Sequence, residues 1–208
     1  MTQYLVRFTN SSGSVLTGDT TSAQWFAIGD PAFSISQTLT FRSGATDIDA
    51  GEASFSALSL TLGSSSLTGK IDQALQSGAA FKIIEIVGYD SIADKLVKTS
   101  SLVLKGAYAA SDAIDTYFGT HALSFTYGDI VQSVGSYDAS GNLTGSATQG
   151  WNPITNRPDD STAFDISSRP GDPVDNGQYT SAVVAQALAP QHVFLQLRNA
   201  DGSALAGL

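Results

Sequence analysis

Short apolar runs separated by turn-forming residues recur along most of the chain, and long stretches of helical periodicity are scarce. Residues 58–62 alternate leucine with serine and threonine, and residues 121–127 alternate apolar with polar side chains in the same way. A period of two places one side of a strand in the core and the other side in solvent. The pattern therefore indicates a mostly β protein in which strands pair antiparallel.

The same criteria predict most of the strands and the turns between them. Residues 88–90 are expected to form the turn between two long apolar segments, and residues 138–142 are expected to form a hairpin turn. Residues 37–52 lose the alternation, so we expect a long loop there. The predicted strands cover residues 4–8, 25–36 with a break at 29–31, 55–62, 81–87, 96–108, 121–127, 130–137 and 143–151.

One helix is predicted, over residues 64–77. A serine supplies the N-cap, Gly78 is placed for the C-cap, and the apolar stripe has helical spacing. The start of this segment, residues 63–70, resembles a phosphate-binding loop. However, five residues separate its glycines instead of four, and Ile71 stands where that motif has Ser or Thr. We interpret the segment as a helix cap.

Charge and composition narrow the classes of function. The chain of 208 residues has nineteen acidic and ten basic residues, a net charge of −9, and no cysteine. Nucleic-acid binding and polybasic membrane contact both need clustered Lys and Arg, so neither is expected. No apolar run is long enough to span a bilayer, and the start of the chain lacks the pattern of a cleaved signal. We expect synthesis in the cytoplasm and, if the protein is secreted, export without a cleaved signal peptide.

Residues that could carry catalysis or bind metal are few. Asp47, Asp49 and Glu52 faintly resemble a calcium loop, but the twelve-residue ligand ladder is absent, and we interpret them as solvated loop carboxylates. His121 and His192 are the only histidines, and neither has a partner at ligand spacing nearby. No Gly-x-Ser-x-Gly elbow occurs. The prediction is a protein without enzyme activity, cofactor or metal.

The composition changes toward the end of the chain. Five of the six prolines lie between positions 153 and 190, which divides the chain into a domain at residues 1–156 and a Pro/Gly-rich extension at 157–208. Residues 193–207 echo residues 4–18 in the order of Asn, Gly, Ser, Leu and Gly. Three interpretations stay open: an edge strand followed by a turn, the start of a second domain, or a strand that adds to a sheet edge.

The order of these elements resembles the Hcp family, the tube proteins of type VI secretion systems. The likeness covers residues 4–156 and ends in Gly150, Trp151 and Asn152, followed by Asn156, which match the family's closing motif. We expect Trp151 to lie in the core. Before this motif come, in the family's order, residues 33–36, 55–60, the single helix, 81–86, 101–104 and 121–125.

The resemblance implies a two-sheet antiparallel β-barrel with one short helix on its flank. It further implies a structural subunit that forms hexameric rings, which stack into a tube, carry effectors and meet sheath and spike proteins. In that case Phe41, Arg42, Asp47 and Asp49 of the predicted loop would lie at the subunit interface. The extension at 157–208 departs from a plain tube subunit and points to an extended or tandem variant. The alternative is an extracellular β-sandwich adhesin or binding module in a tandem array.

Overall fold

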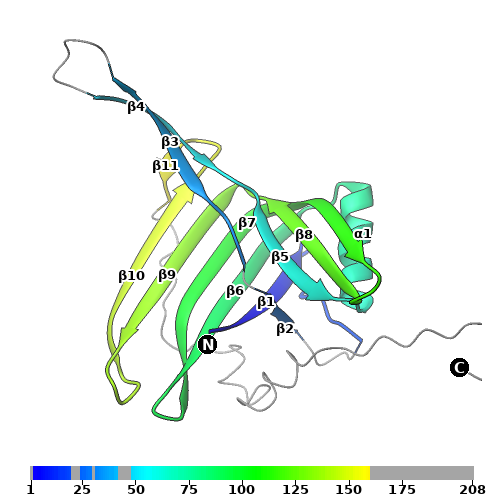
Figure 1. Cartoon of the computed structure of the whole chain (residues 1–208). Helices are drawn as coiled ribbons and strands as arrows, with labels where there is room; N and C mark the ends of the chain where they lie inside the picture. Colours follow the sequence, from blue (N-terminus) through cyan, green and yellow to red (C-terminus); the bar gives the residue numbers. More distant parts are fainter. Residues whose placement is uncertain (1, 20–23, 30, 42–47, 160–208) are drawn as a thin grey trace, which may run out of the picture.

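A computed structural model describes residues 2–19, 24–29, 31–41 and 48–159, and strands account for most of them (Figure 1). None of the described helices is both long and apolar enough to cross a membrane. The elements, in chain order, are β1 (Gln3–Asn10), β2 (Phe26–Ile28), β3 (Ile35–Phe41), β4 (Ile48–Phe55), β5 (Leu58–Gly63), α1 (Ser66–Ser77), β6 (Phe81–Ile92), β7 (Lys95–Asp115), β8 (Thr120–Thr126), β9 (Asp129–Tyr137), β10 (Leu143–Asn152) and β11 (Arg157–Pro158).

Six of the strands close into an antiparallel barrel. The ring runs β7–β6–β1–β2–β5–β8, and pairing between β8 and β7 closes it. Strand β7 has 21 residues, which is long enough to serve two neighbours in succession. Its residues 100–105 pair with β9, and its residues 108–115 pair with β8. The strands β9, β10 and β11 therefore continue the sheet outside the barrel, and we call them the outer ribbon.

The predicted alternation fills the barrel interior. Strand β5 alternates buried and exposed residues as the leucine–serine–threonine pattern requires. Phe8, Phe81 and Phe125 meet inside, with ring centroids 5.5, 5.7 and 6.0 Å apart. Leu67 and Ile71 of α1 are fully buried against this cluster. Complete burial of a side chain of this size contributes about 1.5–3 kcal/mol, so the helix packs as part of the barrel core.

Local chemistry sets both ends of α1. Ser65 is the N-cap, and its backbone N–H donates to Thr68 Oγ1 at 3.1 Å. Gly78 adopts a left-handed conformation with φ +65° and ends the helix. The interpretation of residues 63–70 as a helix cap is confirmed. So is the barrel with one short helix at its flank.

A second, smaller apolar cluster contains Trp25. Its side chain is 1% exposed and packs with Leu5, Val87 and Tyr89. The guanidinium of Arg7 lies 4.6 Å from the Trp25 ring centroid. Arg7 also forms a largely buried ion pair with Glu85 at 2.5 Å. Trp25 therefore serves as a core residue that covers a buried charge pair.

The turn predicted at residues 88–90 is wrong. Strand β6 continues through these residues to Ile92, and Ala93 and Asp94 make the turn with φ of 50° and 61°. Two successive positive φ values match the right-handed twist of a tight hairpin. Gly88 has a different role, since a Cβ there would lie 2.4 Å from Ser100 Oγ and 2.9 Å from the Tyr4 ring. The glycine permits close packing inside a strand.

The long loop predicted at residues 37–52 is also wrong in its described parts. Residues 37–41 belong to β3 and residues 48–52 to β4, and these two strands form a separate two-stranded sheet. Their register runs from Ile35 opposite Phe55 to Phe41 opposite Ile48, with an irregularity between Gln37 and Leu39. These two segments form strands because they pair with each other, although the pattern of apolar and polar residues did not indicate strands there.

Candidate functional site

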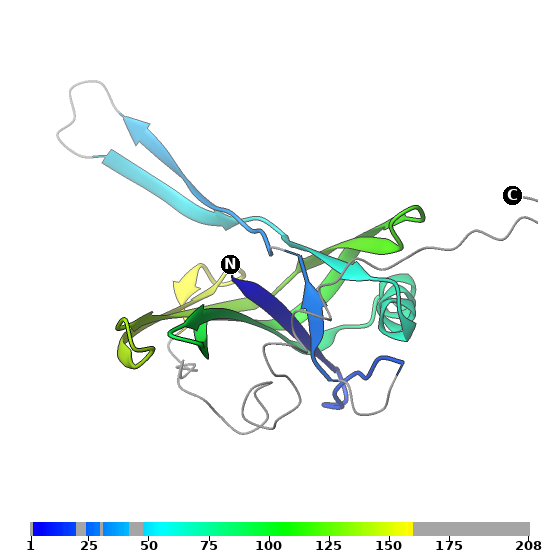
Figure 2. The same cartoon turned by 60° about the horizontal axis from the view of Figure 1, so that its bottom comes forward.

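The β3–β4 hairpin projects well beyond the barrel, and Figures 1 and 2 show it from two sides. Its strands pair only with each other, whereas the other strands belong to one nine-stranded sheet. Backbone hydrogen bonds of about 2.8–2.9 Å join Ala32 and Ser59 and attach its base to β5. Because this arm is attached only at its base, the outer edges of its strands are open to pairing with a strand of another molecule.

The interface residues predicted from the sequence fall on this arm. Phe41 is the last residue of β3, and Asp49 lies in β4, opposite Thr40. The backbone therefore brings these two positions close together near the outer end of the described hairpin. Arg42 and Asp47 lie outside the described residues.

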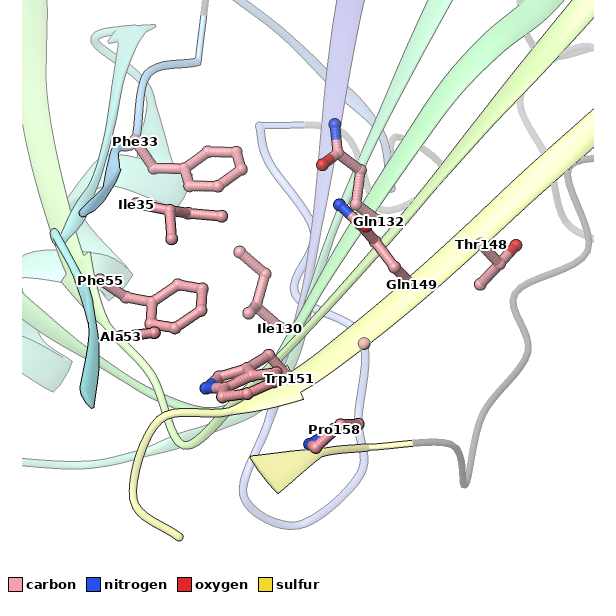
Figure 3. Close-up of a pocket in the computed structure, with 11 residues that line it drawn as sticks. Phe33, Ile35, Ala53, Phe55, Ile130, Gln132, Thr148, Gln149, Trp151 and Pro158 are labelled. Atoms are coloured by element: carbon pink, nitrogen blue, oxygen red, sulfur yellow. The ribbon is translucent and has the colours of Figure 1, made fainter. Parts of the chain in front are cut away.

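A hollow of about 460 Å³ lies between the base of the hairpin and the outer ribbon. Figure 3 shows that Phe33, Ile35 and Phe55 line one side, while Gln132 and Gln149 stand across from them. Ile35 is 53% exposed. The hollow is thus lined by apolar side chains on one wall and by amide groups on the other, and it lies beside the base of the hairpin arm.

Trp151 connects the two sides of this hollow. Its ring stacks on Phe55 with centroids 6.1 Å apart and an interplanar angle of 26°. The Trp151 Nε1 donor is buried and has no hydrogen-bond partner among the described residues. Trp151 is partly buried and packs against the main core. Trp151 was expected in the core, and it lies at the edge of the core. There it also supports the base of the hairpin through Phe55.

The other residues of the closing motif shape the return of the chain onto β10. A Cβ on Gly150 would lie 2.4 Å from the Asp159 carbonyl oxygen, so only glycine lets β11 pass this close. The Asn152 side chain donates to Asp129 Oδ1 and accepts from the Thr155 N–H at 2.8 Å. Asn156 has φ 52°, a left-handed conformation that asparagine tolerates. Gly150, Asn152 and Asn156 together fold the segment after β10 back as β11.

Large apolar side chains are also exposed at the β7–β8 turn. Tyr117 is 78% exposed and Phe118 61% exposed, and their rings meet edge to face at 4.8 Å. Asp115 Oδ1 accepts both of their backbone N–H groups at 2.9 and 3.1 Å, which fixes the turn. Sequence analysis did not single out these two aromatics. Their adjacency in a polar segment, after the apolar alternation has ended, was the available signal.

No family model matches the sequence, and no curated protein does. Solved structures do match. One described as "Structure of a type six secretion system protein" is 18% identical with a TM-score of 0.66, and covers 76% of this chain and 100% of its own.

Two Hcp structures give a similar result. Hcp1 from Salmonella typhimurium is 12% identical with a TM-score of 0.54 and covers 75% of this chain and 99% of its own. Hcp1 from the E. coli EAEC 042 pathovar, a double mutant, is 11% identical with a TM-score of 0.53 and covers 70% and 97%. Identities this low establish similarity of fold alone. The chain has the fold of the Hcp proteins of type VI secretion systems.

Proposed function

We propose that this chain is a structural, tube-forming subunit of a type VI secretion apparatus. Copies close into hexameric rings, the rings stack, and the lumen carries effectors. The partners are then the chain itself and the sheath, spike and effector proteins of the apparatus. The chain acts without catalysis and is secreted by the apparatus.

The observation that carries this proposal is the similarity over the entire length of a type six secretion system protein. In this chain one helix lies between β5 and β6, as the resemblance to the Hcp family implies. Closure of the six-stranded ring removes the free edges of those strands, so the described edges that stay open belong to the hairpin arm and the outer ribbon, and a building block of this kind has few places for unintended pairing. Repeated head-to-tail contact with the right rotation closes such blocks into a ring.

Three features of the surface could form such contacts between subunits. The hairpin arm projects beyond the barrel (Figure 2), as an arm that contacts a neighbouring subunit would. The hollow at its base and the exposed Tyr117 and Phe118 add apolar surface. Aromatic side chains in these positions are typical of interface anchors. The arm is therefore our candidate for the contact between subunits or between rings.

The test is the state of assembly of the full chain. Size-exclusion chromatography with light scattering, over a hundredfold range of concentration, should show a species of six times 21.6 kDa. Negative-stain electron microscopy of that species should show rings with a central hole and, at high concentration, stacks. A strict monomer at every concentration contradicts the proposal and favours the alternative, a binding module in a tandem array.

A further inference from the structure

Three metal-ligating side chains from distant parts of the sequence meet beside the helix. Asp72 comes from α1, Asp112 from β7 and His121 from β8, and one ligand atom of each lies within 4.8 Å of the others. Asp112 pairs with Leu123, two residues from His121, so both side chains stand on the same face of the β7–β8 ladder. Asp72 reaches them from the helix packed over that ladder.

Two of the three side chains are buried, Asp72 is partly exposed, and one carboxylate lacks a full set of partners. The side chains of His121 and Asp112 are 8% and 5% exposed, and His121 Nδ1 lies 2.6 Å from Asp112 Oδ2. The other oxygen, Asp112 Oδ1, is buried with no hydrogen-bond partner among the described residues. A buried carboxylate oxygen without a partner has a large desolvation cost. The site is therefore incomplete as it stands.

A second carboxylate, that of Asp72, lies close to the first. Two carboxylates this close repel each other, and a cation bound between them would offset that repulsion.

We propose that Asp72, Asp112 and His121 bind one divalent transition-metal ion, of which Zn²⁺ is the best fit. An imidazole nitrogen with two carboxylate oxygens suits zinc, whereas calcium and magnesium take oxygen ligands alone. Two ligands of one tetrahedral zinc stand about 3.4 Å apart. His121 Nδ1 and Asp112 Oδ2, now 2.6 Å apart, would therefore have to separate on binding if both are ligands, and no pair of donors starts more than 4.8 Å apart. Three protein ligands leave the fourth position to water.

The ion would join α1 to the β7–β8 hairpin and fix the helix on the barrel. No local motif indicates this site, because its ligands stand 40 and 9 positions apart and no two are at helical or turn spacing. The expectation of a protein without metal rested on that local spacing. The proposal stands apart from the proposed assembly function, since the ligands belong to a single chain.

Isothermal titration of zinc chloride into tag-free, EDTA-treated full chain tests the proposal. One ion per chain should bind, and Asp72→Asn and Asp112→Asn should each weaken binding at least tenfold. Asp94→Asn removes the same charge from an exposed turn and serves as the matched control, with binding unchanged. Absence of one-to-one binding, or equal affinity in all three variants, overturns the proposal.

Nuclear magnetic resonance of the histidine rings keeps the test decisive if a variant fails to fold. The chain has two histidines, so the His121 ring signals are readily assigned, and His192 serves as the internal reference. Stoichiometric zinc should shift the His121 signals and raise the melting temperature of the unmodified chain. Shifts confined to His192, or no shift at equimolar zinc, refute the site.

Discussion

The contact between Phe55 and Trp151 gives the sharpest test of how the hairpin is attached. It joins the end of β4 to the closing motif, and it lies at the margin of the core. Replacing each ring with leucine, singly and together, gives a double-mutant cycle. Leucine keeps an apolar side chain at each site but removes the stacked faces.

The expected magnitude follows from the geometry. Stacked rings with centroids 6.1 Å apart contribute about 0.5–1.5 kcal/mol beyond their buried area, so we expect a coupling energy of about 1 kcal/mol. Trp151→Leu alone should cost about 2 kcal/mol, because the side chain is only partly buried. Trp151→Phe keeps the stack and removes the unpaired Nε1 donor, so its cost should be smaller.

Urea unfolding followed by far-ultraviolet circular dichroism is the suitable assay, because tryptophan fluorescence changes with the substitution itself. All variants must be compared at one protein concentration, since assembly raises apparent stability. The pair Trp151→Leu and Phe118→Leu provides an additive control, because the Phe118 ring contacts Tyr117 at another turn. A coupling energy below about 0.3 kcal/mol for Phe55 and Trp151 refutes the reasoning.

Three further predictions concern a cap, a turn and the arm. Gly78→Ala should cost about 1 kcal/mol in urea unfolding, since φ is +65° while the surrounding space is open. Hydrogen bonds from Asn142, first from its backbone and then from its side chain, lower the pKa of Asp138 in the folded protein. The Asp138 carboxylate therefore stabilises the fold above its unfolded-state pKa, and this stabilisation is lost as the pH falls through its folded-state pKa. Asp138→Ala should therefore destabilise the protein more at pH 7 than at pH 3, and an equal effect at both contradicts this. Replacing Phe41 and Arg42 with alanine should reduce the hexamer fraction in light scattering without lowering the melting temperature, and loss of folding would instead place them in the core.

The parts of the fold that local chemistry determines were predictable from the sequence. The stripe through Leu67 and Ile71, with its serine cap and Gly78, specifies α1 without reference to the rest of the chain. The hairpin turn at residues 138–142 was likewise predictable. In the structure Asp138 Oδ1 accepts the Ser140 and Asn142 N–H groups at 2.9 Å, and such turns depend on neighbours in sequence.

The parts that depend on distant neighbours were not predictable in this way. Gly88 suggested a turn, yet it is a glycine because the side chains of Ser100 and Tyr4 occupy the space beside it. The strands β3 and β4 order through each other, and neither alone has a clear apolar alternation. The cluster of Asp72, Asp112 and His121 depends on helix packing and strand register together. Among the predicted interface positions, only Phe41 and Asp49 have a described backbone, and their role stays a prediction.

The pairing of β7 with several strands has a consequence for misfolding. A slip of this strand by one residue would turn its inward side chains outward. Such a slip would have to occur against β6, β8 and β9 at the same time, because all three pair with it. A wrong register in one of these three pairings is therefore opposed by the other two, so β7 sets the alignment of its neighbours.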